Sequence, residues 1–236
     1  MIEIRDFDSL GHAEHGWLTA KHHFSFAGYH DPARMGWGAL RVWNDDLIQA
    51  KTGFPPHPHR NMEIITYVRE GAITHRDHLN NEGRTVAGDV QVMSAGRGIQ
   101  HEEWNLEDGD ARIFQIWIEP NRQGVTPRWE TASFPKDGRK GRLVPLASGK
   151  ADAPAEALFI AQDAEVLGAS LDAGNEVTHL IGEGRLAYLV PAKGRVEVNG
   201  IEISQRSGAA IRDVEKFTIR ALDDAEIVLV DLPPEE

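Results

Sequence analysis

The stretch His57-Pro58-His59 and, further along the chain, the stretch His101-Glu102-Glu103 decide how the rest of the sequence is interpreted. Side chains alternate between the two faces of a β-strand. His57 and His59 therefore share one strand face, and His101 and Glu103 share another, whereas Glu102 points away. Three imidazoles and one carboxylate that meet inside a small β-barrel form a site for a divalent transition metal.

Short apolar segments separated by turns surround these two stretches. Val90–Met93 and Arg112–Ile118 alternate loosely between apolar and polar residues, which is typical of half-buried strands. Asn199-Gly200 lies between two alternating runs, Arg195–Val198 and Ile201–Ile203, and this dipeptide is a strong hairpin signal. Many short strands with regular turns indicate an all-β sandwich or barrel.

The distribution of turn residues and histidines divides the chain into two parts. Proline and glycine interrupt residues 119–155 repeatedly. Of the 11 histidines, only His179 lies beyond that segment, and it has no partner at ligand spacing. We therefore predict two β-barrel domains: a metal-binding domain over residues 1–130 and a C-terminal domain over residues 131–236 that lacks a metal site.

Composition excludes several classes of protein. The chain has 236 residues, no cysteine and a formal net charge of −12. The lack of cysteine excludes disulfides, thiolate metal sites and cysteine nucleophiles. The negative charge disfavours direct binding to nucleic acid, whose phosphates it would repel. No apolar run is long enough to span a bilayer, and Met1–Asp6 lacks the features of a signal peptide, so we expect a cytoplasmic protein with no membrane association.

Two longer blocks contain the stretches quoted above. Gly53–Glu63 resembles the first cupin motif, with His-x-His followed by Glu, and Gly88–Asn105 resembles the second, with a glycine-rich turn before its histidine. Together with His22-His23-Phe24-Ser25-Phe26, these blocks resemble the pirin family, whose members are bicupins. The resemblance implies two cupin domains of the jelly-roll type. It also implies an iron ion held by the same four residues that strand alternation selects: His57, His59, His101 and Glu103.

Glu63 stands where other cupins have the carboxylate ligand of the first motif. The resemblance to pirins assigns that role to Glu103 instead. Three roles remain open for Glu63: a group that orients a histidine, a base near the substrate, or a competing ligand. His75 and His78 lie beside a turn and are expected to be exposed, and Trp129 is expected to serve in packing.

The ligand set admits several metals. Three imidazoles and one carboxylate leave one or two positions open on a six-coordinate ion, which lets substrate and dioxygen bind. The resemblance to pirins favours Fe(II), whereas the ligands by themselves also admit Ni, Mn, Co, Cu or Zn.

Two classes of function follow from the resemblance, and a third from the cupin scaffold. The first is a metal-dependent dioxygenase of the quercetin 2,3-dioxygenase type, an oxidoreductase that cleaves a flavonol or another small aromatic or enol compound with O2. Glu103 or Glu63 would be its catalytic base. The second is a non-catalytic, iron-binding, redox-sensitive regulator that acts through a protein partner. The third is a small-molecule or sugar-enol isomerase. Oxygen uptake with a flavonol separates the first from the others.

Overall fold

The computed structural model describes residues 1–235, and its 22 strands form four β-sheets. Three 3-10 turns accompany them: η1 (Phe7–Ser9), η2 (Pro32–Arg34) and η3 (Lys136–Arg139). The prediction of an all-β fold is confirmed.

The N-terminal half contains two sheets. The larger has seven strands in the order β12 (Arg128–Ala132), β9 (Val90–Ser94), β6 (Glu63–Glu70), β11 (Ala111–Ile118), β4 (Leu40–Ile48), β3 (Leu18–His22) and β2 (Gly11–Glu14). The smaller has four strands in the order β5 (Thr52–His59), β10 (Ile99–Asn105), β7 (Ala72–Asp77) and β8 (Glu82–Val86).

The C-terminal half repeats this arrangement. Its larger sheet has seven strands in the order β1 (Ile2–Arg5), β20 (Gly208–Ile211), β17 (Leu186–Lys193), β22 (Ala225–Leu232), β15 (Glu165–Leu171), β13 (Val144–Ser148) and β14 (Leu158–Phe159). Its smaller sheet has four strands in the order β16 (Glu176–Leu180), β21 (Lys216–Ala221), β18 (Val196–Val198) and β19 (Ile201–Ile203).

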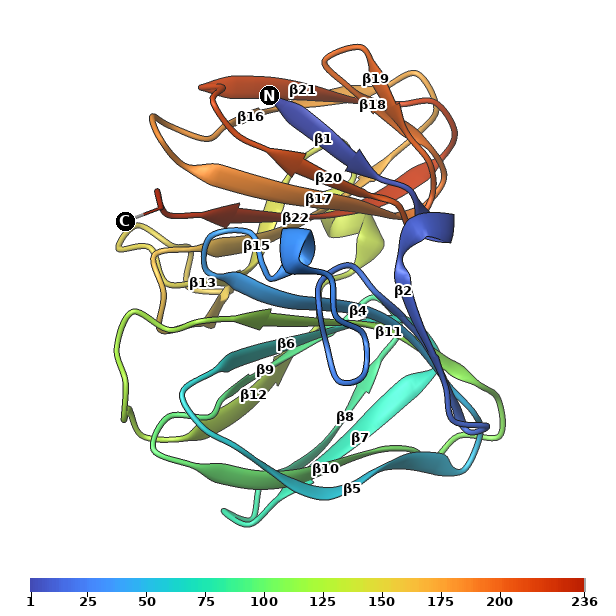
Figure 1. Cartoon of the computed structure of the whole chain (residues 1–236), viewed down its shortest axis with the longest axis vertical. Coiled ribbons are helices and arrows are strands. Elements are labelled where there is room, and N and C mark those ends of the chain that lie inside the picture. The colour runs from blue at the N-terminus through green and yellow to red at the C-terminus, as the bar shows by residue number, and fades with distance from the viewer. Residues whose placement is uncertain (236) are drawn as a thin grey trace.

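The two seven-stranded sheets face each other at the centre of the molecule, and the four-stranded sheets lie outside them (Figure 1). One buried hydrophobic cluster contains residues of both halves, among them Trp43 and Phe114 of the N-terminal half and Tyr188 and Val228 of the C-terminal half. Burial of apolar surface contributes roughly 25 cal/mol per Å². The apolar contacts between the two seven-stranded sheets therefore stabilise the packing of the two halves against each other.

The central strands differ from the prediction of half-buried strands, which is wrong for β9 and β11. Every residue of β9 is buried, and β11 has only two residues that are partly exposed. Both faces of their sheet are covered, one by the four-stranded sheet and the other by the C-terminal half, so apolar residues are needed on both faces. The half-buried pattern occurs instead in β10, which belongs to the outer sheet.

The chain crosses between the halves at its N-terminus. β1 pairs with β20, so the first strand belongs to the C-terminal sheet. β12 pairs with β9 and ends at Ala132, so the predicted boundary between residues 130 and 131 falls inside this strand. The two domain ranges remain a prediction.

The predicted hairpin at Asn199-Gly200 is confirmed. β18 and β19 pair directly around it, and the two turn residues have positive φ values of 47° and 86°. Glycine adopts this left-handed conformation without the penalty that a Cβ atom causes, and asparagine tolerates it better than most residues.

Across residues 1–235 we find no helix with the length and apolar character that crossing a membrane requires. The cytoplasmic location stays a prediction.

Candidate metal centre

Antiparallel pairing of β5 with β10 brings the two motif stretches together. His57 lies opposite His101, and the register shifts between His101 and Glu103 at a β-bulge. Despite this bulge, Glu103 is only 3% exposed, whereas the side chain of Glu102 is 24% exposed. The two glutamates thus lie on opposite faces of β10, as strand alternation predicts.

The imidazoles of His57, His59 and His101 form a compact cluster. Their ring centroids lie 4.4 to 5.0 Å apart, and one nitrogen of each ring can be chosen so that the three atoms lie within 4.8 Å of one another. Burial, reinforced by the neighbouring histidines, lowers the pKa of His59 to about 4 and that of His101 to about 3. Both rings are therefore neutral at neutral pH, which is the form that binds a metal.

Glu103 lies on the same strand as His101 and belongs to a second group of candidate ligands, with His101 and His75. A carboxylate oxygen of Glu103 lies within 4.8 Å of ring nitrogens of His101 and His75. Gln91 Nε2 donates to its Oε1 at 2.6 Å, and Gln115 Nε2 donates to its Oε2 at 2.8 Å. A carboxylate offers about four lone-pair sites, so these bonds orient Glu103 and leave sites for a metal.

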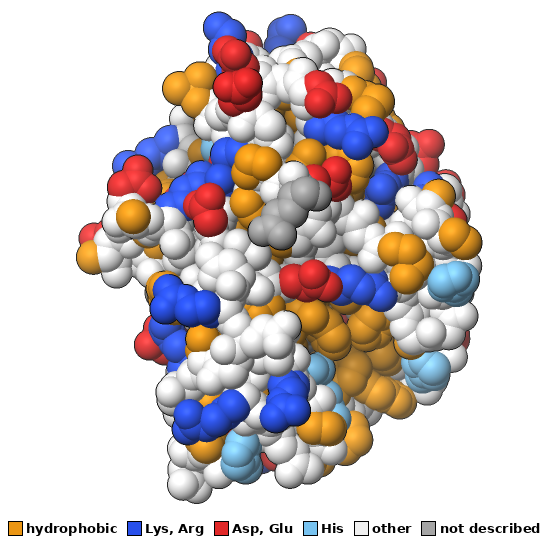
Figure 2. Space-filling view, turned by 60° about the vertical axis from the view of Figure 1, so that its left-hand side comes forward, with side chains coloured by type: hydrophobic (Ala, Val, Ile, Leu, Met, Phe, Trp, Pro, Cys, Tyr) orange, Lys and Arg blue, Asp and Glu red, His pale blue; other side chains and the backbone are white. Residues whose placement is uncertain are grey.

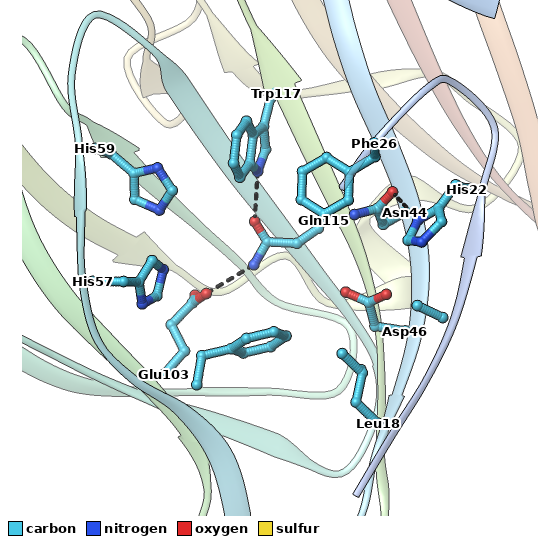
Figure 3. A pocket seen from close by; sticks show the side chains of 12 residues that line it. Leu18, His22, Phe26, Asn44, Asp46, His57, His59, Glu103, Gln115 and Trp117 are labelled. Carbon is cyan, nitrogen blue, oxygen red and sulfur yellow. Dashed lines mark hydrogen bonds between the residues drawn. The ribbon is translucent and has the colours of Figure 1, made fainter. Parts of the chain in front are cut away.

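A cavity of about 170 Å³ adjoins the cluster (Figure 3). His57, His59 and Glu103 line one side of it, as Figure 3 shows. Apolar side chains form much of the remaining wall: Leu18, Phe26, Phe54 and Trp117. A largely apolar cavity with a few polar groups in its wall is typical of a site for a small organic molecule.

A second polar group lies across the cavity from the cluster (Figure 3). His22 Nδ1 and Asn44 Oδ1 are 2.8 Å apart. Oδ1 of Asp46 is buried and has no hydrogen-bond partner within the described part of the chain. Burial, reinforced by the charges of Asp45 and Glu103, raises the pKa of Asp46 well above its usual value. Asp46 therefore holds a proton more readily than an ordinary carboxyl group.

The surface of the N-terminal half has an apolar hollow. Figure 2 shows hydrophobic side chains gathered in a hollow there, with histidines at its border and charged side chains of both signs around it. An apolar hollow with a polar rim is typical of a ligand-binding surface.

Glu63 lies apart from this centre. It begins β6, is fully buried, and accepts a hydrogen bond from Ser94 Oγ at 2.6 Å. Burial raises its pKa, and this effect exceeds the opposing one of the Ser94 bond. Within residues 1–235, Glu63 belongs neither to the cavity lining nor to the groups of candidate ligands. The role of Glu63 as a catalytic base remains a prediction, and the function proposed below assigns that role to Glu103.

The sequence did not predict that His75 lies beside His101. The prediction of an exposed side chain is wrong, because His75 is fully buried and its Nδ1 lies 3.2 Å from Nδ1 of His101. β7 pairs with β10 and places His75 opposite Glu103, while the ring of Trp129 stacks on it at 4.8 Å. The available signal was the spacing of His75 and Asp77, which puts both side chains on one strand face.

Comparisons with known proteins show the family of this chain. The family model described as Pirin matches residues 3–118, and the one described as quercetinase C-terminal cupin domain matches residues 146–232. A pirin-like protein of Caulobacter vibrioides is 63% identical over 231 residues, which cover 98% of this chain and 99% of that protein. This chain belongs to the pirin family. A quercetin 2,3-dioxygenase of Escherichia coli K12 is 43% identical to this pirin over 235 residues, covering 99% of this chain and 100% of the other.

A solved structure extends the likeness to three dimensions. The bacterial pirin YhhW from Escherichia coli, in complex with nickel(II), matches this pirin with a TM-score of 0.93 and 42% identity. The match covers 99% of this chain and 100% of that chain. The predicted fold of two cupin domains is thereby confirmed.

Proposed function

We propose that this protein is a mononuclear metal-dependent dioxygenase of the pirin type that cleaves a flavonol such as quercetin with O2. The observation that carries the proposal is the three-histidine cluster, of which His57 and His59 line a largely apolar cavity. The cluster supplies neutral nitrogen donors, and the cavity accepts part of a flat aromatic molecule beside them. The Escherichia coli relative named quercetin 2,3-dioxygenase supports the reaction class.

The residues present fit a divalent metal ion. His57, His59, His101 and Glu103 would hold it through three nitrogen donors and one oxygen donor. Nε2 of His101 is buried and has no hydrogen-bond partner within residues 1–235, as expected of a ring nitrogen kept for a metal. We propose Fe(II) as the bound metal. Nickel(II), which the Escherichia coli pirin binds, is the second candidate, and Mn, Co, Cu and Zn suit the same donors.

When bound, such an ion supplies Lewis acidity and open coordination positions. The chain's own residues orient the flavonol and move its proton. Phe54 and Trp117 would flank the rings, so that the 3-hydroxyl group faces the histidines. Glu103 would accept the hydroxyl proton, because its carboxylate lines the cavity beside them. Both oxygen atoms of O2 end in the cleaved product, a depside, and one ring carbon leaves as carbon monoxide.

We expect the metal-loaded protein to consume O2 in the presence of quercetin and to release an equal amount of carbon monoxide. Carbon monoxide distinguishes ring cleavage from the slow autoxidation of the flavonol. An oxygen electrode and a haem-based assay for carbon monoxide measure the two gases. Metal-free protein prepared with a chelator is the control and should give the background rate of quercetin alone.

Retention of the metal without any change in quercetin, in each of the metal forms named above, would contradict the dioxygenase. The iron-binding regulator would then be the better account. The regulator hypothesis is tested by measuring whether a protein partner binds the Fe(II) and Fe(III) forms of this protein with different affinities.

A further inference from the structure

A chain of hydrogen bonds leads from His101 into β7. Nδ1 of His101 lies 3.2 Å from Nδ1 of His75, and Nε2 of His75 lies 3.0 Å from Oδ2 of Asp77. His75 and His101 are at most 2% exposed, and the side chain of Asp77 is 0% exposed. His75 therefore links His101 to Asp77 in a hydrogen-bonded chain that is shielded from water.

The outer end of this chain determines where its protons lie. Oδ1 of Asp77 accepts hydrogen bonds from the backbone N–H groups of Leu79 at 2.8 Å and Asn81 at 3.1 Å. Burial alone would raise the pKa of Asp77, but hydrogen bonds from His75, Asn81 and Leu79 outweigh burial and lower it. An ionised carboxylate only accepts hydrogen bonds, so Nε2 of His75 carries the proton.

The remaining proton positions follow from that one. A neutral imidazole has one donor and one acceptor nitrogen, so Nδ1 of His75 is an acceptor. Nδ1 of His101 must then donate to it, which leaves Nε2 of His101 with a free lone pair. This is the same nitrogen that is buried without a hydrogen-bond partner in the described residues.

We propose that Asp77 and His75 are positioning residues that keep the proton of His101 on Nδ1 and present its Nε2 to the metal. The inference rests on the metal ligand that the proposed function assigns to His101, but not on the dioxygenase reaction. It concerns which nitrogen holds a proton rather than a change of protonation with pH. The opposite assignment, in which His75 itself binds the metal with His101 and Glu103, is an outcome of the test.

Asp77→Asn is the sharpest variant, because the two backbone N–H groups keep its amide oxygen at the position of Oδ1. Its amide nitrogen then replaces Oδ2 and donates to Nε2 of His75. The proton of His75 moves to Nδ1, and His101 must hold its own proton on Nε2, where the metal should bind. Asp77→Ala removes the same negative charge without imposing this reversal.

We expect the affinity for Co(II), titrated against a competing chelator, to fall about 10- to 100-fold in Asp77→Asn. The loss in Asp77→Ala should be smaller, whereas a role through charge alone predicts equal losses. Glu82→Ala is the matched control: it also removes one carboxylate, but the partner of that carboxylate is Arg76 at 3.0 Å, outside the chain to His101. Its affinity should stay close to that of the wild type.

His75→Phe separates positioning from ligation, because it keeps a ring stacked on Trp129 but offers no nitrogen. If His75 is a positioning residue, His75→Phe should bind Co(II) more weakly but with an unchanged absorption spectrum. This measurement tests the inference even if Asp77→Asn does not fold. A spectrum altered by loss of a ligand, or equal affinities in Asp77→Asn and Asp77→Ala, overturns the inference. A wild-type protein that binds no Co(II) overturns the proposed metal site instead.

Discussion

His101→Ala is expected to lower the affinity for a divalent metal by at least about a hundredfold, since four ligands together contribute roughly 10–16 kcal/mol in structural zinc sites. His101 belongs to both groups of candidate ligands, one with His57 and His59 and one with His75 and Glu103. Its loss therefore disrupts either arrangement. The neighbouring imidazoles lie on other strands, so none of them can take its place without moving the backbone.

Metal content after dialysis and competition with a chelator measure this effect. The matched control is His30→Ala, which removes an exposed histidine outside the candidate site. Unfolding of both variants should be followed in the presence of chelator, because His101→Ala also leaves a small void next to His75. Wild-type metal affinity in a folded His101→Ala protein would show that the metal binds elsewhere.

The histidines of the candidate site could be predicted from sequence because that prediction needs only local periodicity. His57 and His59 are two residues apart, and so are His101 and Glu103, so each pair shares a face in any regular strand. The motif resemblance then indicated that the two strands belong to one barrel. The structure agrees on the cluster, while the full set of four ligands remains a proposal.

His75 and Asp46 could not be placed in the same way. His75 reaches His101 only through the pairing of β7 with β10, and that register depends on residues far apart in the sequence. Asp46 and its neighbour Asp45 look alike in the sequence, but Asp45 faces Arg69 and Arg206, whereas Asp46 lines the cavity. Which of two adjacent carboxylates is paired depends on packing between the halves.

In the fold, too, the features that local sequence determines could be predicted, whereas those that depend on long-range packing could not. The strand-rich class and the Asn199-Gly200 hairpin follow from turn chemistry, which is local. The burial of both faces of β9 does not, because it requires knowing that the two large sheets stack at the centre. Nor does local sequence show that Ile2–Arg5 pairs with Gly208–Ile211 across the length of the chain.

The free energy of unfolding of the metal-free protein is expected to fall as the pH drops from about 6.5 to 5. Burial lowers the pKa of His23 well below its usual value, with Arg5 adding to the effect, and lowers that of His101 to about 3. Below about pH 6.5 the unfolded chain binds protons at these histidines that the folded chain does not bind. For His101 this lowers the stability by up to about 2 kcal/mol over this range, and His23 acts in the same direction.

Asp46 has the opposite effect on the pH dependence of stability, so its protonation can be measured from that dependence. Because its folded pKa is raised, the folded chain holds a proton there that the unfolded chain releases above about pH 4. This contribution increases stability as the pH falls and so offsets part of the histidine effect.

Asp46→Asn removes the offset and should make the loss of stability steeper by up to about 1.4 kcal/mol per pH unit. Urea denaturation at several pH values measures both slopes, with the exposed Asp152→Asn as the matched control. Identical slopes in Asp46→Asn and the wild type would mean that Asp46 is ionised in the folded protein, and that the wall opposite the histidines is charged.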